Sequence, residues 1–568
     1  MNETVKHHLA LLYDAAAATG LEEAVEILVS RSREGRLSEV SSRKRDLTHA
    51  DCVLIAYGDQ VRTVGESPLR TLSDFLSNRV SHAISAVHIL PFYPSSSDDG
   101  FSVMDYYSVD PDLGSWDDVE SLGRNFDLMF DAVFNHASAQ GVWFGKFVRQ
   151  EPGWETAFFT ISGDPDLSKV VRPRALPLLT EFETAAGKKQ VWTTFSADQA
   201  DINFSDPHML LRILEVLLFY VIKGARYIRL DAIAFLWKTP GTSCIHLEQT
   251  HRAIQLMRAV LDEVAPDVQL ITETNVPHSD NVSYFGDGSN EAQLVYNFAL
   301  PPLVFHTLRT GDATRLRRWA QALVLPSDRV TFFNFLASHD GIGLNPARGI
   351  LDPKEIDALV QTAIDHNGFV SYKNNPDGTT SPYELNISYF DALSNPLGDE
   401  SEGTQVARFL AAHSIMLALR GLPGIYFHSL FGSRGDRQGA EESGIPRRIN
   451  RKKVDVAALE AELDDPRSLR ARVFAGIRRM IGARRSHPAF SPYASQVIPD
   501  APPDVFLIAR KASNGKDVLC ATNVTASAIS FPLPRGNLEW TSLPGFPEVS
   551  ADGTVLLPPY GVSWFAAP

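Results

Sequence analysis

The chain has 568 residues, of which 44% are hydrophobic and 21% charged, and its formal net charge is −15. This length exceeds what one simple core holds, so we expect one large domain with additions. The acidic balance argues against a nucleic-acid partner, because phosphate binding favours a basic surface. It does not exclude anionic small substrates, which respond to local charge.

The cysteines and the N-terminus indicate a cytoplasmic protein. Cys52, Cys244 and Cys520 lie far apart without the spacing of a metal site, and we expect them to be reduced and buried. Residues 1–20 carry charges and lack the apolar core of a signal peptide. No apolar run is long enough to span a membrane, so we expect no membrane partner.

Residues 2–34 are predicted to form two amphipathic helices. Val5 and Leu9 begin an apolar face at helical spacing, and Gly20 is expected to end the first helix. The polar stretch that follows is expected to be a solvated connection. We expect this N-terminal helical arm, residues 1–50, to pack against the main domain and to carry no chemistry.

Residues 51–487 are predicted to form the catalytic (β/α)8 TIM barrel, an α/β fold. Short apolar runs alternate there with helical patterns, which is typical of a barrel of parallel strands. The eight expected strands are 52–57, 86–92, 128–134, 225–230, 268–272, 293–298, 330–336 and 424–428.

Two connections are too long for ordinary loops and are expected to form lobes over the barrel mouth. The first covers about 137–204, after strand three, and the second, expected to be irregular, covers about 341–403, after strand seven. In residues 488–568 apolar side chains recur every two residues, and this pattern predicts an antiparallel β-sandwich. Its expected strands are 505–509, 517–522, 528–533 and 554–557.

The fourth barrel strand ends in an arginine and an aspartate that face the same way. Side chains on a strand repeat every two residues, so Arg229 and Asp231 project together. We expect Arg229 to lower the pKa of Asp231 and to keep it ionised, as a carboxylate nucleophile requires. The alternative for an isolated pair of this kind is a structural ion pair.

Other acids and histidines follow the neighbouring strands. Active sites of such barrels lie at the C-terminal ends of the strands. There Glu273 follows strand five, His339 and Asp340 follow strand seven, and His136 follows strand three. Converging acids repel one another, so the arrangement is costly unless it serves chemistry.

Four segments at these ends resemble the signature regions of the α-amylase superfamily in order and spacing. They are DAVFNH (131–136), RLDAIAF (229–235), ITETNVPH (271–278) and ASHDGIG (337–343). The resemblance extends from about residue 52 to the end of the chain. It implies that Asp231 is the nucleophile, Glu273 the general acid/base and Asp340 the transition-state stabiliser, with His136 and His339 holding glucose hydroxyls.

This assignment fits the chemistry of retaining glycosidic enzymes. Their mechanism needs two carboxyl groups roughly 5–5.5 Å apart, one ionised to attack and one protonated to donate. An apolar setting would raise the pKa of Glu273. Asp340 would bond sugar hydroxyls more strongly as the ring flattens.

Three further segments resemble the sucrose phosphorylase subfamily: 191–204, 381–393 and 445–453. An alternative is that Phe101 and Phe195 are core residues and that Arg172 or Arg174 belongs to a surface pair. The resemblance implies glucose contacts from Asp98, Phe101, Phe195, Gln199 and Arg447, with Arg229 beside the nucleophile, and phosphate contacts from Arg174 and Tyr383.

Within the subfamily, segments 237–251, 338–351 and 374–386 most resemble the glucosylglycerate phosphorylases. Ser381 and Glu384 stand where sucrose phosphorylases have Asp and Gln, in a loop expected to face the acceptor. Glu384 must point at hydroxyls, pair with a nearby cation or turn away, because it would repel a glycerate carboxylate. That carboxylate requires a cation or a hydrogen-bond donor, and the candidates are Arg348, Lys373 and Lys238.

The resemblance implies transfer of glucose from 2-O-α-D-glucosyl-D-glycerate to phosphate, giving α-D-glucose 1-phosphate and D-glycerate. Alternatives are a sucrose 6-phosphate phosphorylase, a sucrose phosphorylase, an α-glucosidase or transglucosidase, and a non-catalytic barrel subunit. No cofactor and no metal is implied. We expect small-molecule partners only, glucosylglycerate and phosphate, and leave a homodimer open.

Overall fold

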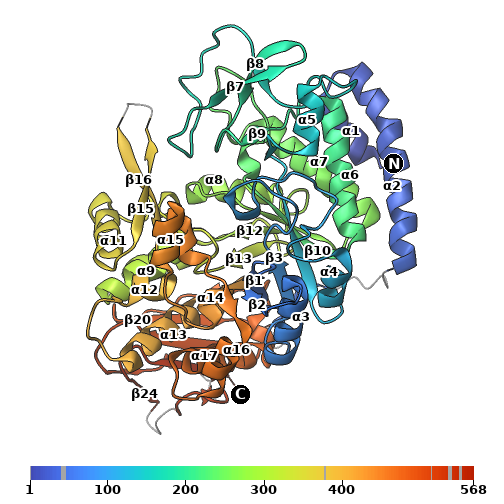
Figure 1. Cartoon of the computed structure of the whole chain (residues 1–568). Helices are drawn as coiled ribbons and strands as arrows, with labels where there is room; N and C mark the ends of the chain where they lie inside the picture. Colours follow the sequence, from blue (N-terminus) through green and yellow to red (C-terminus); the bar gives the residue numbers. More distant parts are fainter. Residues whose placement is uncertain are drawn as a thin grey trace.

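The computed structural model describes residues 2–39, 46–375, 379–512, 515–534, 540–548 and 553–567. At its centre eight parallel strands form a closed barrel (Figure 1). Each strand pairs with its neighbours in chain order, and β1 pairs with β17 to close the ring. The predicted (β/α)8 barrel is therefore confirmed. Its strands are β1 (Val53–Ala56), β3 (Ala86–Ile89), β4 (Asp127–Ala132), β10 (Ala225–Leu230), β11 (Gln269–Thr272), β12 (Leu294–Tyr296), β13 (Thr331–Asn334) and β17 (Leu422–Tyr426).

The eighth strand begins and ends two residues earlier than the predicted 424–428. The chain turns into helix α14 (Phe427–Leu430) directly after Tyr426. The apolar run continues across that boundary, and a continuous apolar run does not distinguish a buried strand from a buried helix.

Helices surround the barrel and bury their apolar faces against the strands (Figure 1). The fully buried strands therefore have apolar side chains on both faces, as parallel sheets require. The main helices are α3 (Pro68–Arg79), α4 (Trp116–Gly123), α6 (Pro207–Ile222), α7 (Glu248–Val264), α9 (Leu300–Thr310), α10 (Thr314–Ala322), α13 (Glu402–Ala418) and α17 (Leu469–Arg485), and shorter ones are α8 (His278–Val282), α12 (Tyr389–Leu393), α15 (Arg437–Ser443) and α16 (Val456–Asp464).

The N-terminal arm consists of α1 (Glu3–Leu12) and α2 (Ala15–Glu39), which pack against α7 and α6 (Figure 1). The prediction that Gly20 ends a helix was wrong, because Gly20 lies inside α2. The break comes earlier, at Asp14, whose side chain accepts the backbone N–H of Ala17 at 2.9 Å and so starts the second helix.

Both connections predicted to form lobes contain regular structure. The first contains two small sheets, and the second contains a three-stranded sheet and the helices α11 and α12, so its predicted irregularity was wrong. The elements of the first are β5 (His136–Ser138), α5 (Val142–Val148), β6 (Thr160–Ile161), β7 (Leu179–Thr184), β8 (Gly187–Trp192) and β9 (Gln199–Asp201), and those of the second are β14 (Ile342–Gly343), η4 (Asn345–Ala347), α11 (Pro353–Asp365), β15 (Phe369–Asn374) and β16 (Thr380–Asn386).

The C-terminal part contains two antiparallel sheets that share an apolar core, as a sandwich does. A strand that was not predicted, β25, lies between β21 and β23 in the larger sheet. The strands are β19 (Gln496–Val497), β20 (Val505–Arg510), β21 (Val518–Asn523), β22 (Ile529–Pro532), β23 (Thr541–Ser542), β24 (Thr554–Leu557) and β25 (Val562–Ala566).

The cysteine prediction is confirmed, since Cys52, Cys244 and Cys520 are each buried and unpaired. Among the described residues, no helix has both the length and the apolar character needed to cross a membrane.

Candidate active site

A cavity of about 300 Å³ opens at the C-terminal ends of the barrel strands, beneath the two lobes. Residues that follow β10, β11 and β13 supply three of its acids, Asp231, Glu273 and Asp340. All but two of the predicted site residues line the cavity. The other lining residues among them are Asp98, Phe101, His136, Arg174, Phe195, Gln199, His339, Tyr383, Glu384 and Arg447.

The two exceptions are Arg229 and Ser381. Arg229 is 2% exposed and lies beneath the cavity floor. Ser381 belongs to β16, and its hydroxyl donates to the side chain of Asn375 at 3.0 Å. The described structure therefore gives Ser381 no place in the cavity wall, because its side chain bonds within its own hairpin.

Arg229 connects three acids. Its Nη1 donates to Asp231 Oδ1 at 2.9 Å and to Asp131, and its Nη2 lies 3.8 Å from Glu273 Oε2. Asp131 stands directly opposite Arg229 across the β4–β10 pair and also contacts His88 at 2.7 Å. Asp131 and His88 were not assigned roles from the sequence, although Asp131 opens the first signature motif.

Burial raises the pKa of both Asp231 and Glu273 to about 7, and the neighbouring acids add to this effect. The prediction that Arg229 lowers the pKa of Asp231 below its usual range was wrong. Arg229 does oppose the shift, but Asp131 shares its charge and the site is fully buried. Because Arg229 lies closer to Asp231 than to Glu273, we infer that the proton held by this pair resides on Glu273.

Glu273 is also oriented by the backbone. Its Oε2 accepts the N–H of Ala232 at 3.1 Å. Ala232 adopts a left-handed conformation with φ of 48°, which non-glycine residues rarely do. Strain of this kind is common at functional sites, and here it lies in the turn that follows β10 and Asp231.

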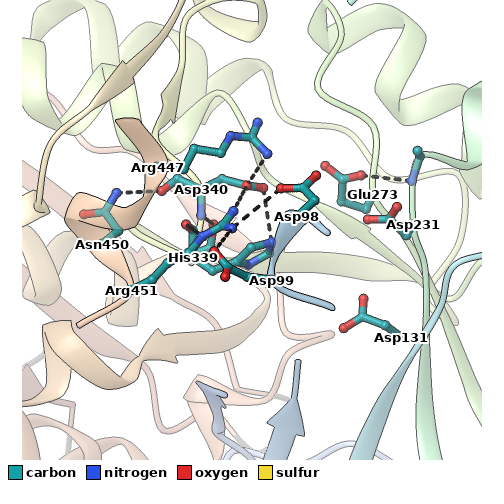
Figure 2. Close-up of polar contacts among 12 residues, drawn as sticks. Asp98, Asp99, Asp131, Asp231, Glu273, His339, Asp340, Arg447, Asn450 and Arg451 are labelled. Atoms are coloured by element: carbon teal, nitrogen blue, oxygen red, sulfur yellow. Dashed lines mark hydrogen bonds and ion pairs between the residues drawn. The ribbon is translucent and has the colours of Figure 1, made fainter. Parts of the chain in front are cut away.

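Asp340 is the acid that stays ionised. Burial alone would raise its pKa, but the charges of Arg447, His339, Arg451 and Arg229 outweigh burial and lower the pKa. Figure 2 shows Arg447 and Arg451 beside this carboxylate, with Nη1 of Arg447 2.7 Å from its Oδ1.

Glu384 pairs with a nearby cation, one of the three arrangements expected for it. Its two carboxylate oxygens accept from Arg447 Nε at 2.9 Å and Nη2 at 2.6 Å. The same guanidinium thus holds Glu384 on one side and Asp340 on the other. Glu384 is only 2% exposed, and Arg447 balances its charge before any acceptor enters.

Arg451 is a further arginine of the site and was not predicted, although the motif at 445–453 contains it. Its Nη1 lies 2.7 Å from Asp99 Oδ2 and 3.6 Å from Asp98 Oδ1, and its Nη2 lies 3.5 Å from Asp340 (Figure 2). Asp98 and Asp99 both have positive φ values, 52° and 48°. Arg451 therefore holds a strained turn that presents Asp98 to the cavity.

Phe101 and Phe195 both contact the histidines of the site. The Phe101 ring stacks on His339 with centroids 4.7 Å apart, and Phe195 lies 5.2 Å from the His136 ring. Gln199 donates to the backbone oxygen of Phe101 at 3.2 Å. These contacts make a partly apolar wall of the kind that sugar rings pack against.

The three cations proposed for the acceptor carboxylate occupy different positions. Lys238 lies outside the cavity wall, because its Nζ is 2.7 Å from Asp201 Oδ2 and donates to Asn135 at 2.8 Å. It is therefore excluded as an acceptor contact. Arg348 and Lys373 both line the cavity.

Asn275 also lines the cavity and was not predicted. Its Oδ1 is buried and accepts no hydrogen bond within the described part of the chain. A Cβ on Gly343 would lie 2.7 Å from this atom, so only glycine allows the close approach. Among the described residues, no group of three or more His, Cys, Asp or Glu side chains could hold a metal ion.

Comparisons with known proteins agree with this geometry. The sequence model of the α-amylase catalytic domain matches residues 81–341. The chain is 53% identical to a glucosylglycerate phosphorylase of Allomeiothermus silvanus, covering 92% of this chain and 93% of that one. It is 31% identical to a sucrose phosphorylase of Agrobacterium vitis, over 77% and 88%. The crystal structure of sucrose 6F-phosphate phosphorylase from Thermoanaerobacter thermosaccharolyticum superposes with a TM-score of 0.73 at 23% identity, covering 85% of this chain and 96% of that one.

Proposed function

The chain belongs to the α-amylase family, and from this premise we propose that it is a retaining glucosylglycerate phosphorylase, a hexosyltransferase. It transfers glucose from 2-O-α-D-glucosyl-D-glycerate to phosphate and releases α-D-glucose 1-phosphate and D-glycerate. The observation that carries the proposal is the shared Arg229 contact of Asp231 and Glu273 in a cavity whose other wall is cationic. The 53% identity to a relative of that activity selects the substrate.

The first displacement forms a glucosyl-enzyme. A carboxylate oxygen of Asp231 attacks C1 of the glucose, and the bond from C1 to the glycerate oxygen breaks. Glu273 gives its proton to that oxygen, so glycerate leaves with a neutral hydroxyl. Asp340 remains ionised and bonds hydroxyls of the flattened ring.

The second displacement returns the enzyme to its starting state. An oxygen of hydrogen phosphate attacks C1 from the face that glycerate left, and the ester bond to Asp231 breaks. The phosphate proton passes to Glu273, which recovers its acid form. Two inversions at C1 preserve the α configuration.

Arg174 and Tyr383 are proposed to receive the phosphate. Both line the cavity, and Arg174 lies at 3.9 Å from its nearest acid, Asp98, which leaves the guanidinium open to a second anion. A guanidinium binds phosphate oxygens through paired, charge-assisted hydrogen bonds. Asp98 and Arg447 are proposed to hold the far side of the glucose.

The alternatives are distinguished by what the acceptor side offers. Sucrose phosphorylase activity is disfavoured by the lower identity to the Agrobacterium vitis enzyme. A hydrolase would have no use for a cationic wall, and a non-catalytic subunit would have no reason to retain all three acids. We further expect a cytoplasmic location and small-molecule substrates only.

The test supplies a panel of acceptors with α-D-glucose 1-phosphate as donor. The rate of phosphate release is measured for each acceptor. D-Glycerate is expected to give the highest kcat/KM, ahead of fructose and fructose 6-phosphate. If fructose 6-phosphate exceeded glycerate by tenfold, which corresponds to about 1.4 kcal/mol of transition-state binding, the sucrose 6-phosphate alternative would be correct.

A further inference from the structure

Two cations of the second lobe face the cavity from neighbouring segments. Arg348 is the residue after η4, and η4 follows β14, the strand that pairs with β16. Lys373 lies near the end of β15. The three strands form one sheet, so these side chains are carried by one unit. Both line the cavity that contains Glu273 and Tyr383.

The charges of Arg348 and Lys373 are not balanced within the described part of the chain. Arg348 bonds only neutral oxygens, Nε to Asn345 Oδ1 at 3.3 Å and Nη2 to the backbone oxygen of Pro382 at 3.0 Å. Among the described residues, Lys373 has no ion pair, and the charge that acts on its pKa is that of Arg348. By contrast, Arg447 is fully engaged by Asp340 and Glu384.

The two cations also repel each other. Burial lowers the pKa of Lys373, and the charge of Arg348 lowers it further. Lys373 is half-buried and Arg348 is exposed, and two neighbouring like charges without a counter-ion are unfavourable until an anion binds. An anion bound between them would remove both penalties, because it restores a charge-assisted contact to each.

We propose that Arg348 and Lys373 bind the carboxylate of the acceptor and thereby select glycerate over a neutral three-carbon alcohol. This assignment rests on the proposed function and identifies the residues that bind the acceptor carboxylate. Glu384 does not oppose it, because Arg447 neutralises that carboxylate. The contact holds the acceptor by its acid group while the hydroxyl on its second carbon faces C1 of the glucosyl-enzyme.

The test uses α-glucosyl fluoride as donor, because fluoride leaves readily and every acceptor then competes for the same glucosyl-enzyme. Glycerate, glycerol and phosphate are supplied in pairs, so that two acceptors compete in each reaction. The products, namely glucosylglycerate, glucosylglycerol, glucose 1-phosphate and the glucose formed by water, are then measured as ratios. The variants are Arg348→Gln, Lys373→Gln and the double variant. Lys354→Gln, an exposed cation at the start of α11, is the matched control.

We expect each single variant to lower the ratio of glucosylglycerate to glucosylglycerol by about tenfold, and the double variant to lower it further. The Lys354→Gln ratio is expected to equal that of the wild type. Product ratios do not depend on how much enzyme is folded, so the result holds even for a destabilised variant.

Three outcomes would overturn the assignment or its premise. If the variants keep the wild-type preference for glycerate over glycerol, Arg348 and Lys373 do not bind the acceptor carboxylate. If they lose only glucose 1-phosphate relative to glucose, these cations bind phosphate instead. If the wild-type enzyme itself shows no preference for glycerate over glycerol, the proposed function fails rather than this assignment.

Discussion

Arg229 contacts Asp231, Glu273 and Asp131 from beneath the cavity, and its single charge cannot balance all three carboxylates. Burial, and then the charges of the neighbouring acids, raise the pKa of both Asp231 and Glu273 to about 7, and we place the proton that the pair holds near neutral pH on Glu273. This is the condition that double displacement needs near neutral pH, with one group ionised and the other protonated.

Asp231→Asn is expected to lower the rate of glucose 1-phosphate formation by about 10⁴-fold or more, because the amide cannot form the covalent intermediate. The fold should persist, since Asn has nearly the same shape and still accepts from Arg229. Thermal unfolding of the variant serves as the control for the rate measurement. Turnover near the wild-type rate would exclude the covalent mechanism.

Glu273→Gln is expected to raise the unfolding temperature more at pH 8 than at pH 5.5. Burial raises the pKa of Glu273 from 4.5 to about 7, so the folded state binds its proton more tightly than the unfolded chain. Stability from this group is complete below about pH 4.5 and is lost as the pH rises through 7. Gln does not ionise, so the variant keeps this stability at high pH.

The control for this measurement is Glu183→Gln, which changes an exposed glutamate on β7. Differential scanning calorimetry of both variants across the pH range decides the matter. An effect of Glu273→Gln that does not change with pH would show that Glu273 is not protonated in the folded enzyme at neutral pH.

The sequence predicted which acids meet, but it did not predict their protonation. The motifs contain Asp231, Glu273 and Asp340, and strand periodicity placed Arg229 beside the nucleophile. The pKa of Asp231 is raised first by burial and then by Asp131, which lies opposite Arg229 through the register of β4 and β10. A single sequence does not contain that register, so the direction of the shift was missed.

At the scale of elements, the β15–β16 hairpin and the 3-10 helix η5 (Pro446–Asn450) are joined by the Glu384–Arg447 contact. Glu384→Gln is expected to lower kcat/KM for glucosylglycerate by about 10- to 100-fold. An amide replaces one acceptor with a donor, so the bidentate contact is lost and Arg447 no longer holds Asp340 in place.

The matched control is Glu441→Gln, which removes a surface contact to Arg437 on α15 at 2.8 Å. Steady-state kinetics of the two variants separates a role in the cavity from a general effect of losing an ion pair. Equal kcat/KM for Glu384→Gln and the wild type would show that the contact does not position Asp340.

The N-terminal arm is expected to stabilise the barrel without taking part in chemistry. Leu9 is fully buried where α1 packs on α7, so Leu9→Ala should cost about 2–5 kcal/mol of packing free energy and lower the unfolding temperature. The kcat is expected to stay unchanged. Leu11→Ala on the same helix, at a position 44% exposed, is the control; a loss of kcat in Leu9→Ala at a temperature where it is folded would refute a purely structural role.

Element boundaries were the least predictable feature, for local physical reasons. Gly20 has the composition of a helix stop, but nothing in the structure requires its conformational freedom and α2 continues through it. Asp14 supplies the real signal, a side chain that caps the following turn. The second lobe was predicted to be irregular from its Asn, Pro and Gly residues, but Gly343 lies inside β14 and Pro382 and Asn386 lie inside β16.

For the whole molecule, the alternation of apolar runs with helical patterns was sufficient to predict the barrel. Each strand is buried on both faces, which makes the runs continuous and easy to recognise. The C-terminal sheets were only partly predicted, because β25 pairs with β21 and β23 through contacts distant in sequence.

The measurement that tests the central claim most directly is proton NMR of the first product formed from 2-O-α-D-glucosyl-D-glycerate and phosphate. We predict α-D-glucose 1-phosphate and D-glycerate in equal amounts, with no β anomer and little free glucose. The β anomer of glucose 1-phosphate would contradict the double displacement through Asp231. Free glucose as the main product would identify a hydrolase instead of a phosphorylase.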